Sequence, residues 1–320
     1  MKLQFVVSDQ TNPYWNIAVE NYLLSLPETE AVTLYLWKNR RTVVIGQNQN
    51  PFSECNVVAL EADGGYLMRR RTGGGAVYHD DGNINFSFVV PKALYDLQRQ
   101  FRVIQRAVAD FGIVAELSGR NDILTEGRKF SGNAFSKGKY QDLHHGTILI
   151  KGNMEDLQRY LKPKPAKLQK HGVASVRSRV VNLSELNPAI TSESIVPHLR
   201  KAFESEYSEH SEYSEYSEYS EIIKRPEVRT LYEQFASDEW RYGRWRSFTA
   251  QRSGQFDWGG VELSLTVDND VITDVQLASD AIDLAALDEA RRLLTGASIA
   301  TPPQHAPSVL LDDILALVYG

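Results

Sequence analysis

The sequence predicts an α/β protein in which a large domain of mixed sheets with flanking helices precedes a small α+β domain. Helical and strand-like segments alternate over residues 12–161, which favours a mixed α/β domain. Residues 256–277 alternate apolar and polar side chains around the turn Asp268-Asn269-Asp270, which is typical of a β-hairpin. The 320 residues suffice for both units, and we place them at 1–240 and 241–320, with a linker near 240–252.

The large domain alternates helices with strands. Helices are predicted where apolar side chains recur every three or four residues, at 12–26, 94–111 and 154–161. Strands are predicted where short apolar runs stand between polar turns, at 32–37, 42–45, 66–68, 84–90, 113–117 and 147–151. The segment between the last two strands is polar and rich in glycine, which favours a loop around Gly119, Gly127, Gly132 and Gly138.

The small domain begins with a strand that has one apolar face. Val261, Leu263, Leu265 and Val267 point one way, because side chains alternate along a strand. Strand 271–277 returns beside it, and the helical segments 282–294 and 308–318 have apolar stripes that can cover this face. These elements predict one compact α+β unit.

A Ser-Glu-Tyr repeat at 205–221 accounts for the net charge of the chain. The repeat contains six glutamates and no lysine or arginine, and without it the formal net charge changes from −6 to 0. The rest of the chain therefore gives no support for a nucleic-acid surface. The repeat has no aliphatic residue to bury, so we interpret it as a flexible, low-complexity insertion or at most an exposed extension of a helix.

Composition also bounds the compartment of the protein. No run of 18 apolar residues is present, so we expect no transmembrane helix, and the first residues lack the pattern of a signal peptide. The single cysteine, Cys55, excludes an internal disulfide framework and fits a reducing compartment. We therefore expect a cytoplasmic protein.

The most informative motif is the run 69–80, in which three arginines lead directly into three glycines. Glycine lets backbone approach a phosphate closely, and arginine supplies a permanent charge with several donors. The run lies between two apolar segments, which predicts a strand–loop–strand hairpin. Neither a Walker phosphate loop nor a dinucleotide fingerprint fits, because both open a helix. The structural alternative is a tight glycine-rich turn with a solvated basic flank.

Three further segments concentrate polar residues of functional type. They are 118–134, which contains Ser-Gly-Arg-Asn-Asp-Ile and Gly-Arg-Lys-Phe-Ser-Gly-Asn-Ala, then His144-His145-Gly146-Thr147, and the basic segment 172–182. The two histidines have no cysteine or third histidine at metal-ligand spacing, so a zinc site is improbable.

Taken in order, these motifs resemble the lipoate–protein ligase A family of the biotin/lipoate ligase superfamily. The resemblance covers nearly the whole chain, and residues 256–262 match the small accessory domain of the family. The Ser-Glu-Tyr repeat departs from the family pattern but lies between motifs. The resemblance implies a biotin/lipoate-ligase-like catalytic domain followed by that accessory domain.

The resemblance also implies a reaction in two steps. Lipoate or octanoate first attacks the α-phosphate of ATP, giving an acyl adenylate and pyrophosphate. A lysine of an acceptor protein then attacks the acyl carbonyl and releases AMP. The implied acceptors are lipoyl domains of 2-oxoacid dehydrogenase acyltransferase subunits and the glycine-cleavage H protein. ATP enters with Mg²⁺, no tightly bound cofactor, nucleic acid or membrane is implied, and a monomer is the default.

Lys129 is the candidate catalytic residue. By resemblance it contacts both the acyl carbonyl and the α-phosphate, and fixed positive donors aimed at developing charge are usually the largest catalytic effect. The alternative is a solvated lysine in a loop. For ATP or the adenylate, the resemblance implies Arg70, Gly75, Ala76, Val77, Tyr78, Asn83, Asp122 and Lys129. For lipoate it implies Gly73, Gly74, Gly75, Val77, His79 and Lys129.

Several of these assignments keep an alternative. Arg69 and Arg71 are interpreted as flanking charges. His79 either orients the ligand or is a hydrogen-bonded structural residue, and neither role is favoured over the other. Asp122 is the candidate Mg²⁺ ligand, or else it caps its loop. Residues Ser175, Arg177 and Arg179 correspond to a loop that closes over the adenylate, or else to a basic strand edge. An apolar slot for the acyl chain is expected from Trp37, Val44, Val77 and Phe86.

Two other functions remain open. A cofactorless octanoyl or lipoyl transferase of the same fold often uses a cysteine nucleophile, and Cys55 is the sole candidate, far from the motifs. A non-catalytic lipoate-binding protein would bind without releasing pyrophosphate. Biotin ligation is a further rival, but its basic glycine signature is absent from these loops.

Overall fold

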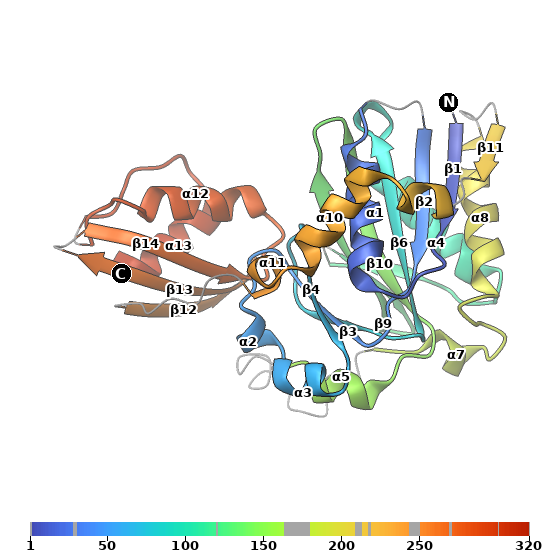
Figure 1. Ribbon diagram of the computed structural model, residues 1–320, viewed down its shortest axis with the longest axis horizontal. Helices are drawn as coiled ribbons and strands as arrows, with labels where there is room; N and C mark the ends of the chain where they lie inside the picture. Colours follow the sequence, from blue (N-terminus) through green and yellow to red (C-terminus); the bar gives the residue numbers. More distant parts are fainter. Residues whose placement is uncertain are drawn as a thin grey trace.

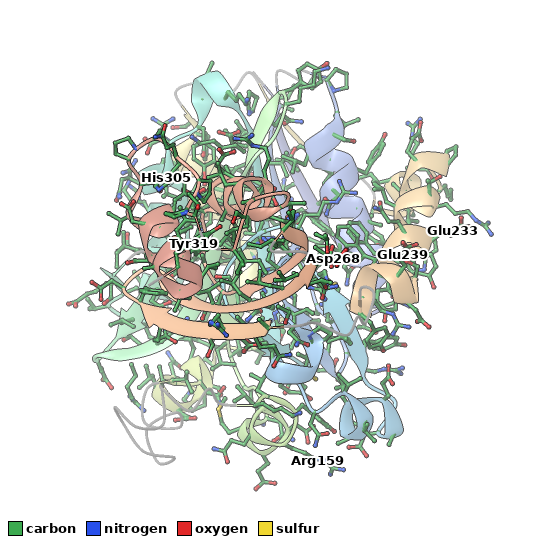
Figure 2. The ribbon with its side chains drawn as sticks, turned by 90° about the vertical axis from the view of Figure 1, so that its left-hand side faces the viewer. Arg159, Glu233, Glu239, Asp268, His305 and Tyr319 are labelled. Carbon is green, nitrogen blue, oxygen red and sulfur yellow. The ribbon has the colours of Figure 1, made fainter. Side chains whose placement is uncertain are left out.

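The computed structural model describes residues 2–27, 31–119, 121–162, 180–208, 213–216, 219–242, 250–268, 271–299 and 301–319. Two units are visible, a large one built on residues up to Tyr242 and a small one built on residues from Ala250 onward (Figure 1). Seen from the side of the small unit, that unit lies in front of the large one (Figure 2). The large unit and the small unit together confirm the predicted fold class. The boundary at 240 and 241 stays a prediction, although the helix α11 ends at Tyr242 and the strand β12 begins at Ala250.

An eight-stranded sheet is the backbone of the large unit. Its strand order is β11-β1-β2-β6-β10-β9-β8-β7, with β1, β2 and β11 parallel and the pairs from β2 to β7 antiparallel. The strands are β1 Lys2–Val7, β2 Ala31–Trp37, β6 Asn83–Pro91, β7 Glu116–Ser118, β8 Asp122–Thr125, β9 Arg128–Lys137, β10 Gln141–Leu149 and β11 Tyr213–Tyr216.

Helices cover both faces of this sheet (Figure 1). Because side chains alternate along a strand, Leu34 and Leu36 of β2 pack toward α4 and α8, whereas Tyr35 and Trp37 pack toward α1. Asn12 caps α1 through its side chain, and Pro13 fits the first turn. The helices of the large unit are α1 Pro13–Ser25, α2 Pro51–Glu54, α3 Val57–Ala62, α4 Leu97–Ala109, α5 Met154–Tyr160, α7 Leu183–Leu186, α8 Ile195–Glu206, α9 Tyr219–Ile223, α10 Pro226–Ala236 and α11 Asp238–Tyr242.

A second, three-stranded sheet corrects the predicted hairpin. Its order is β4-β3-β5, formed by β4 Tyr66–Arg69, β3 Thr42–Ile45 and β5 Val77–His79. The glycine run joins β4 to β5, but β3 lies between them, so these two strands do not pair. The predicted partner segment 84–90 belongs to β6 of the large sheet. The run is therefore a crossing loop, which we call the glycine loop (residues 70–76).

The predicted polar loop at 118–138 is also wrong. Most of it forms the antiparallel strands β8 and β9, and Glu126 and Gly127 make the turn with positive φ angles of 50° and 72°. Glycine at such a turn is as typical of a hairpin as of a loop, which explains the error. Helices α1, α4 and α5 confirm the predicted helices.

The small unit is the predicted hairpin with an additional strand. Strands β12 Ala250–Phe256, β13 Gly259–Asp268 and β14 Val271–Ser279 form an antiparallel sheet. Helices α12 Leu284–Leu294 and α13 Val309–Tyr319 cover it, and Val261, Leu263 and Leu265 are buried beneath them as predicted. Strand β12 was not predicted.

The described part of the Ser-Glu-Tyr repeat corrects the expectation of an exposed extension. Residues 213–216 form β11, which pairs in parallel with β1 at the edge of the large sheet. Tyr207 and Tyr219 are buried, and the Tyr219 ring stacks on Tyr35 with centroids 6.2 Å apart. Aromatic rings supply the buried area that aliphatic residues would otherwise give.

Candidate functional site

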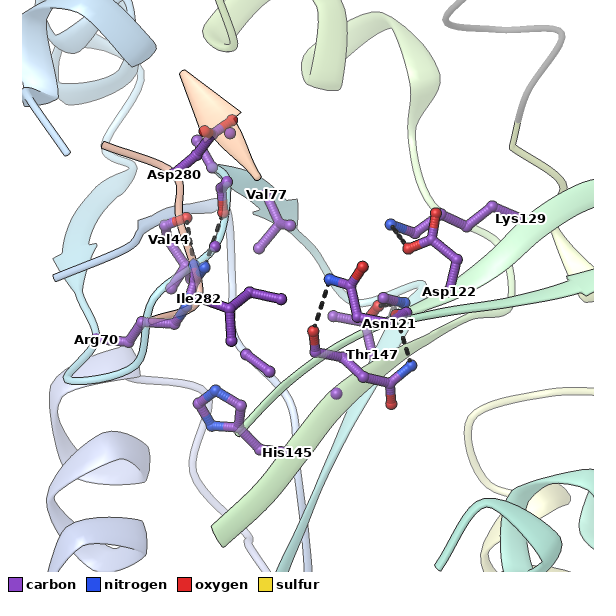
Figure 3. A pocket seen from close by; sticks show the side chains of 18 of the residues that line it. Val44, Arg70, Val77, Asn121, Asp122, Lys129, His145, Thr147, Asp280 and Ile282 are labelled. Atoms are coloured by element: carbon purple, nitrogen blue, oxygen red, sulfur yellow. Dashed lines mark hydrogen bonds and ion pairs between the residues drawn. The ribbon is translucent and has the colours of Figure 1, made fainter. Parts of the chain in front are cut away.

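A cavity of about 540 Å³ lies between the glycine loop, the large sheet and the small unit. Figure 3 shows Lys129 and Asp122 on one side and Arg70, Val44 and Asp280 on the other. The cavity brings together eight of the predicted site residues: Arg70, Gly74, Gly75, Ala76, Val77, His79, Asp122 and Lys129.

Lys129 enters the cavity from β9, and Asp122 from β8 beside it. Their side chains form an ion pair, with Lys129 Nζ 2.7 Å from Asp122 Oδ1, and each is about one third exposed (34% and 36%). A register shift in the β8–β9 pairing lies next to Lys129, and such bulges redirect side chains. A Cβ at Gly132 would lie 2.8 Å from Lys129 Nζ, so that glycine leaves room for the ammonium. Lys129 therefore lies on a strand and not in a loop, and its ammonium is paired with Asp122.

Arg70 is buried and shapes the glycine loop from inside. Its Nη2 donates to the carbonyls of Gly73 (2.7 Å) and Gly75 (2.9 Å), and its Nε donates to Thr72 Oγ1 at 3.0 Å. Burial lowers the pKa of Arg70 to about 10, and Glu20 opposes this effect. Most of its donors are therefore engaged by the loop before any ligand binds.

The three glycines of the loop differ in what surrounds them. A Cβ on Gly73 would lie 2.2 Å from the Ala281 carbonyl of the small unit, and one on Gly74 would lie 2.9 Å from Arg70 Nη2. A Cβ on Gly75 would meet open space. Among the described residues, the N–H groups of Gly75 and Ala76 have no hydrogen-bond partner. Gly75 and Ala76 both line the cavity, so this end of the loop brings unpaired backbone donors to its wall.

Arg69 is not a flanking charge, which corrects the prediction. It is buried, and its Nη1 donates to the carbonyls of Gln47 (2.8 Å) and Gln49 (2.6 Å). Its Nε donates to the Trp240 carbonyl of α11 at 2.9 Å. Arg71 is exposed as expected, and its guanidinium lies over the ring of Trp240 at 5.6 Å. Arg69 thus fastens α11 to the start of the glycine loop.

Four predicted residues do not line the cavity. Tyr78 packs in the core beside the sheet β4-β3-β5 and donates to Asp156 Oδ2. Asn83 donates to Asn85, which does line the cavity. Gly73 faces the small unit, and Phe86 is buried in the core on the other face of the sheet. Ser175, Arg177 and Arg179 lie outside the described residues.

The apolar part of the cavity is formed mainly by α1, β2 and the three-stranded sheet β4-β3-β5. Trp37, Val44 and Val77 line it as predicted. Other lining residues were not assigned from the sequence, among them Ile17, Met68, Asn121, Asn133, His145, Thr147, Phe256, Trp258, Asp280 and Ile282. Asn121, Asn133, His145 and Thr147 stand in the predicted motifs, but nothing in the sequence indicates that the small unit supplies one wall.

His79 is a buried, neutral residue in the wall of the cavity. Its Nδ1 lies 3.2 Å from Asn39 Nδ2, and because an amide nitrogen donates, the proton of the neutral ring belongs on Nε2. Burial lowers the pKa of His79 to about 3, with nearby Arg70 and His145 adding to the shift. His79 Nε2 has no partner among the described residues.

We expect His79 to remain neutral from about pH 9 to about pH 5 in a ring-NMR titration, assigned with His79→Gln. An unfolded histidine titrates near about 6.5. Between about pH 6.5 and about pH 3, His79 is protonated in the unfolded chain but not in the folded protein. The free energy of unfolding therefore falls as the pH is lowered through this window. A His79 midpoint near neutral pH would contradict the assignment.

The described residues contain no group of three side chains able to hold a metal ion. Asp122 is the carboxylate paired with Lys129, and Mg²⁺ commonly takes one or two carboxylates with the remaining ligands from phosphates and water. Asp122 therefore fits a metal that arrives with a phosphate substrate, rather than one held by the protein alone.

Comparisons with known proteins agree on one family. A family model of the lipoyl protein ligase A/B catalytic domain matches residues 12–204, and one of the bacterial lipoate protein ligase C-terminus matches residues 246–301. The chain is 40% identical over 292 residues to the lipoate-protein ligase A of Psychrobacter cryohalolentis, covering 90% of this chain and 86% of the relative. It is 38% identical over 299 residues to that of Bdellovibrio bacteriovorus, covering 92% and 88%.

Solved structures give the same grouping. The crystal structure of P. falciparum LipL1 in complex with lipoate is similar with a TM-score of 0.85 and 31% identity, covering 98% of each chain. A lipoate-protein ligase A bound with ATP is similar in fold, with a TM-score of 0.63 and 23% identity, covering 76% of this chain and 99% of that one.

Proposed function

The chain belongs to the lipoate–protein ligase A family, and on that premise we propose that it joins lipoate or octanoate to a lysine of lipoyl domains. The reaction uses ATP and passes through an acyl adenylate, with release of pyrophosphate and then AMP. The observation that carries the proposal is one cavity in which the Lys129 ammonium and the free N–H groups of Gly75 and Ala76 accompany an apolar wall.

Each part of the cavity suits one part of the acyl adenylate. The apolar side chains of Trp37, Val44 and Val77 suit the acyl chain, which has no hydrogen-bonding group along its length. Lys129 suits the negative charge that develops on the α-phosphate and on the acyl carbonyl. The ion pair with Asp122 fixes the position of the ammonium, so little reorganisation is needed during the reaction.

The roles of individual residues are part of the proposal. Gly74, Gly75, Ala76 and Val77 border the adenylate and the acyl group, and Asp122 contributes one oxygen to the Mg²⁺ that accompanies ATP. Arg70 acts indirectly, by holding the loop. Asn83 and Gly73 also act indirectly, because Asn83 donates to the cavity-lining Asn85 and the Gly73 carbonyl accepts from Arg70. Tyr78 acts from its place on β5 between Val77 and His79, which both line the cavity.

The acceptors in this proposal are lipoyl domains of 2-oxoacid dehydrogenase acyltransferase subunits and the glycine-cleavage H protein. An archaeal relative in fold, a bi-partite lipoate protein ligase, has been solved with its E2 lipoyl domain. We propose a monomer that works in the cytoplasm without nucleic acid, membrane or a tightly bound cofactor. Within the described residues, no helix reaches the length and apolarity that crossing a membrane demands.

The proposal is tested with purified protein, ATP, Mg²⁺, lipoate and an unmodified lipoyl domain, followed by mass spectrometry of the acceptor. A mass gain that disappears without ATP supports the ligase. Failure to modify any lipoyl domain would overturn it. Lipoate binding without pyrophosphate release would instead identify a non-catalytic lipoate-binding protein.

Replacement of Cys55 separates the ligase from a cysteine-dependent transferase. Cys55 is buried, and burial raises the pKa of its thiol to about 12, so it carries almost no thiolate. We expect Cys55→Ala to keep ligase activity within about twofold, because the thiol takes no part in the reaction. Loss of activity in a variant that unfolds at the wild-type temperature would favour the transferase.

A further inference from the structure

A line of buried hydrogen bonds connects a cation and an anion beneath the glycine loop. Thr72 Oγ1 lies 3.0 Å from Arg70 Nε and 2.9 Å from His145 Nε2. His145 Nδ1 in turn lies 2.8 Å from Glu20 Oε2. Glu20 comes from α1 and His145 from β10, and all four side chains are buried, with Glu20 and Thr72 each only 1% exposed.

The Glu20 carboxylate sets the direction of the donors in this line when the His145 ring is neutral. A carboxylate only accepts, so the single proton of the ring lies on Nδ1 and points at Glu20. His145 Nε2 then accepts the proton of Thr72 Oγ1, and Thr72 Oγ1 in turn accepts from Arg70 Nε. Ser87 Oγ donates to the same oxygen of Glu20 at 2.5 Å. Every proton therefore points toward Glu20.

The cation end of the line shapes the functional loop. Arg70 holds the carbonyls of Gly73 and Gly75, and Gly75 and Ala76 line the cavity. A carboxylate that fixes the tautomer of a histidine, and through it the geometry of a reacting group, is an established arrangement in enzymes. Here the group at the far end is a loop rather than a nucleophile.

We propose that Glu20 and His145 are positioning residues of the ligase, in which Glu20 keeps the proton of His145 on Nδ1 and thereby orients Thr72, Arg70 and the glycine loop. The proposal rests on the proposed function, because it assigns the loop to adenylate formation. Neither residue needs to contact the reacting atoms. Glu20 also supplies the negative charge nearest to the buried guanidinium on this line, which makes Arg70 less costly to bury.

The state of the His145 ring is the first test. Nitrogen-15 NMR of histidine-labelled full-length protein, with His145→Gln to assign the signals, distinguishes the two tautomers. We expect the Nδ1–H form in the wild type and loss of that form in Glu20→Gln, which keeps the shape of the side chain but removes its charge. An Nε2–H ring or a doubly protonated ring in the wild type would overturn the proposal. Because no substrate is present, this result does not depend on ligase activity.

The second test is the rate of adenylate formation, followed by pyrophosphate release. We expect Glu20→Gln to lower kcat by roughly tenfold to a hundredfold and to change the KM for lipoate much less, because the loop is misplaced while the apolar wall is kept. Glu233→Gln on the exposed face of α10 is the matched control and should match the wild type. An unchanged kcat in folded Glu20→Gln would contradict the proposal.

Thr72→Val interrupts the line one step from the loop. It should keep the Nδ1–H ring, since Glu20 remains, yet show a similar fall in kcat. Normal turnover in this variant would also overturn the proposal, and the variant serves if Glu20→Gln does not fold.

Discussion

Lys129→Ala should lower the rate of adenylate formation and of acyl transfer by about a hundredfold or more. The substitution removes the ammonium that Asp122 holds in the cavity, and the loss of one preorganised donor to developing charge typically has an effect of this size. Pyrophosphate release measures the first step, and transfer from supplied lipoyl adenylate to an acceptor measures the second. The KM for lipoate should change little, because the apolar wall is untouched.

Lys137→Ala is the matched control, since Lys137 ends the same strand β9 and is exposed. We expect it to behave as the wild type in both steps. If Lys129→Ala retained activity within about threefold of Lys137→Ala, Lys129 would not be the residue that stabilises either transition state.

Arg70→Lys should be among the most destabilising single changes in the large unit. One ammonium cannot reach Thr72 Oγ1 and the carbonyls of Gly73 and Gly75 together, as the planar guanidinium does. Each buried acceptor left without a donor costs about 1–3 kcal/mol, so we expect the free energy of unfolding to fall by roughly 2–4 kcal/mol. Urea denaturation measures this change.

Arg71→Lys provides the comparison for Arg70→Lys. Arg71 is exposed and lies over Trp240, where a lysine can still place its charge, so the free energy of unfolding should change by no more than about 0.5 kcal/mol. Equal stability of the two variants would show that the buried hydrogen bonds of Arg70 do not hold the loop. Ligase activity of Arg70→Lys should also fall, because the free N–H groups of Gly75 and Ala76 depend on the loop geometry.

Local periodicity was sufficient for those regular elements whose apolar pattern is strong. The apolar stripe of α4 and the alternation in β13 are local patterns, and both elements form where the sequence predicts them. The pairing of β4 with β3 is not local, because the strand inserted beside β4 comes from more than twenty residues upstream. The sequence therefore predicts that the glycine run is a loop, but it does not predict that this loop crosses over β3 to join β4 to β5.

In the candidate site, too, local motifs could be predicted from the sequence but contacts between distant segments could not. Ordered motifs brought Lys129, Asp122 and the glycines to attention, and the structure gathers them at one cavity. The burial of Arg69 could not be predicted, because an arginine reads as a solvated charge unless the carbonyls that surround it are known. Glu20 shows no motif either, since its partners come from β6 and β10.

The strand β11 has a practical consequence for following this protein in solution. It lies six places from β8 in the large sheet, and neighbouring strands are about 4.8 Å apart, so it is about 30 Å from Asp122. That separation is well suited to energy transfer between two dyes. A fluorophore introduced beside β11 would report the arrival of a labelled lipoyl domain at the cavity while standing too far away to obstruct it.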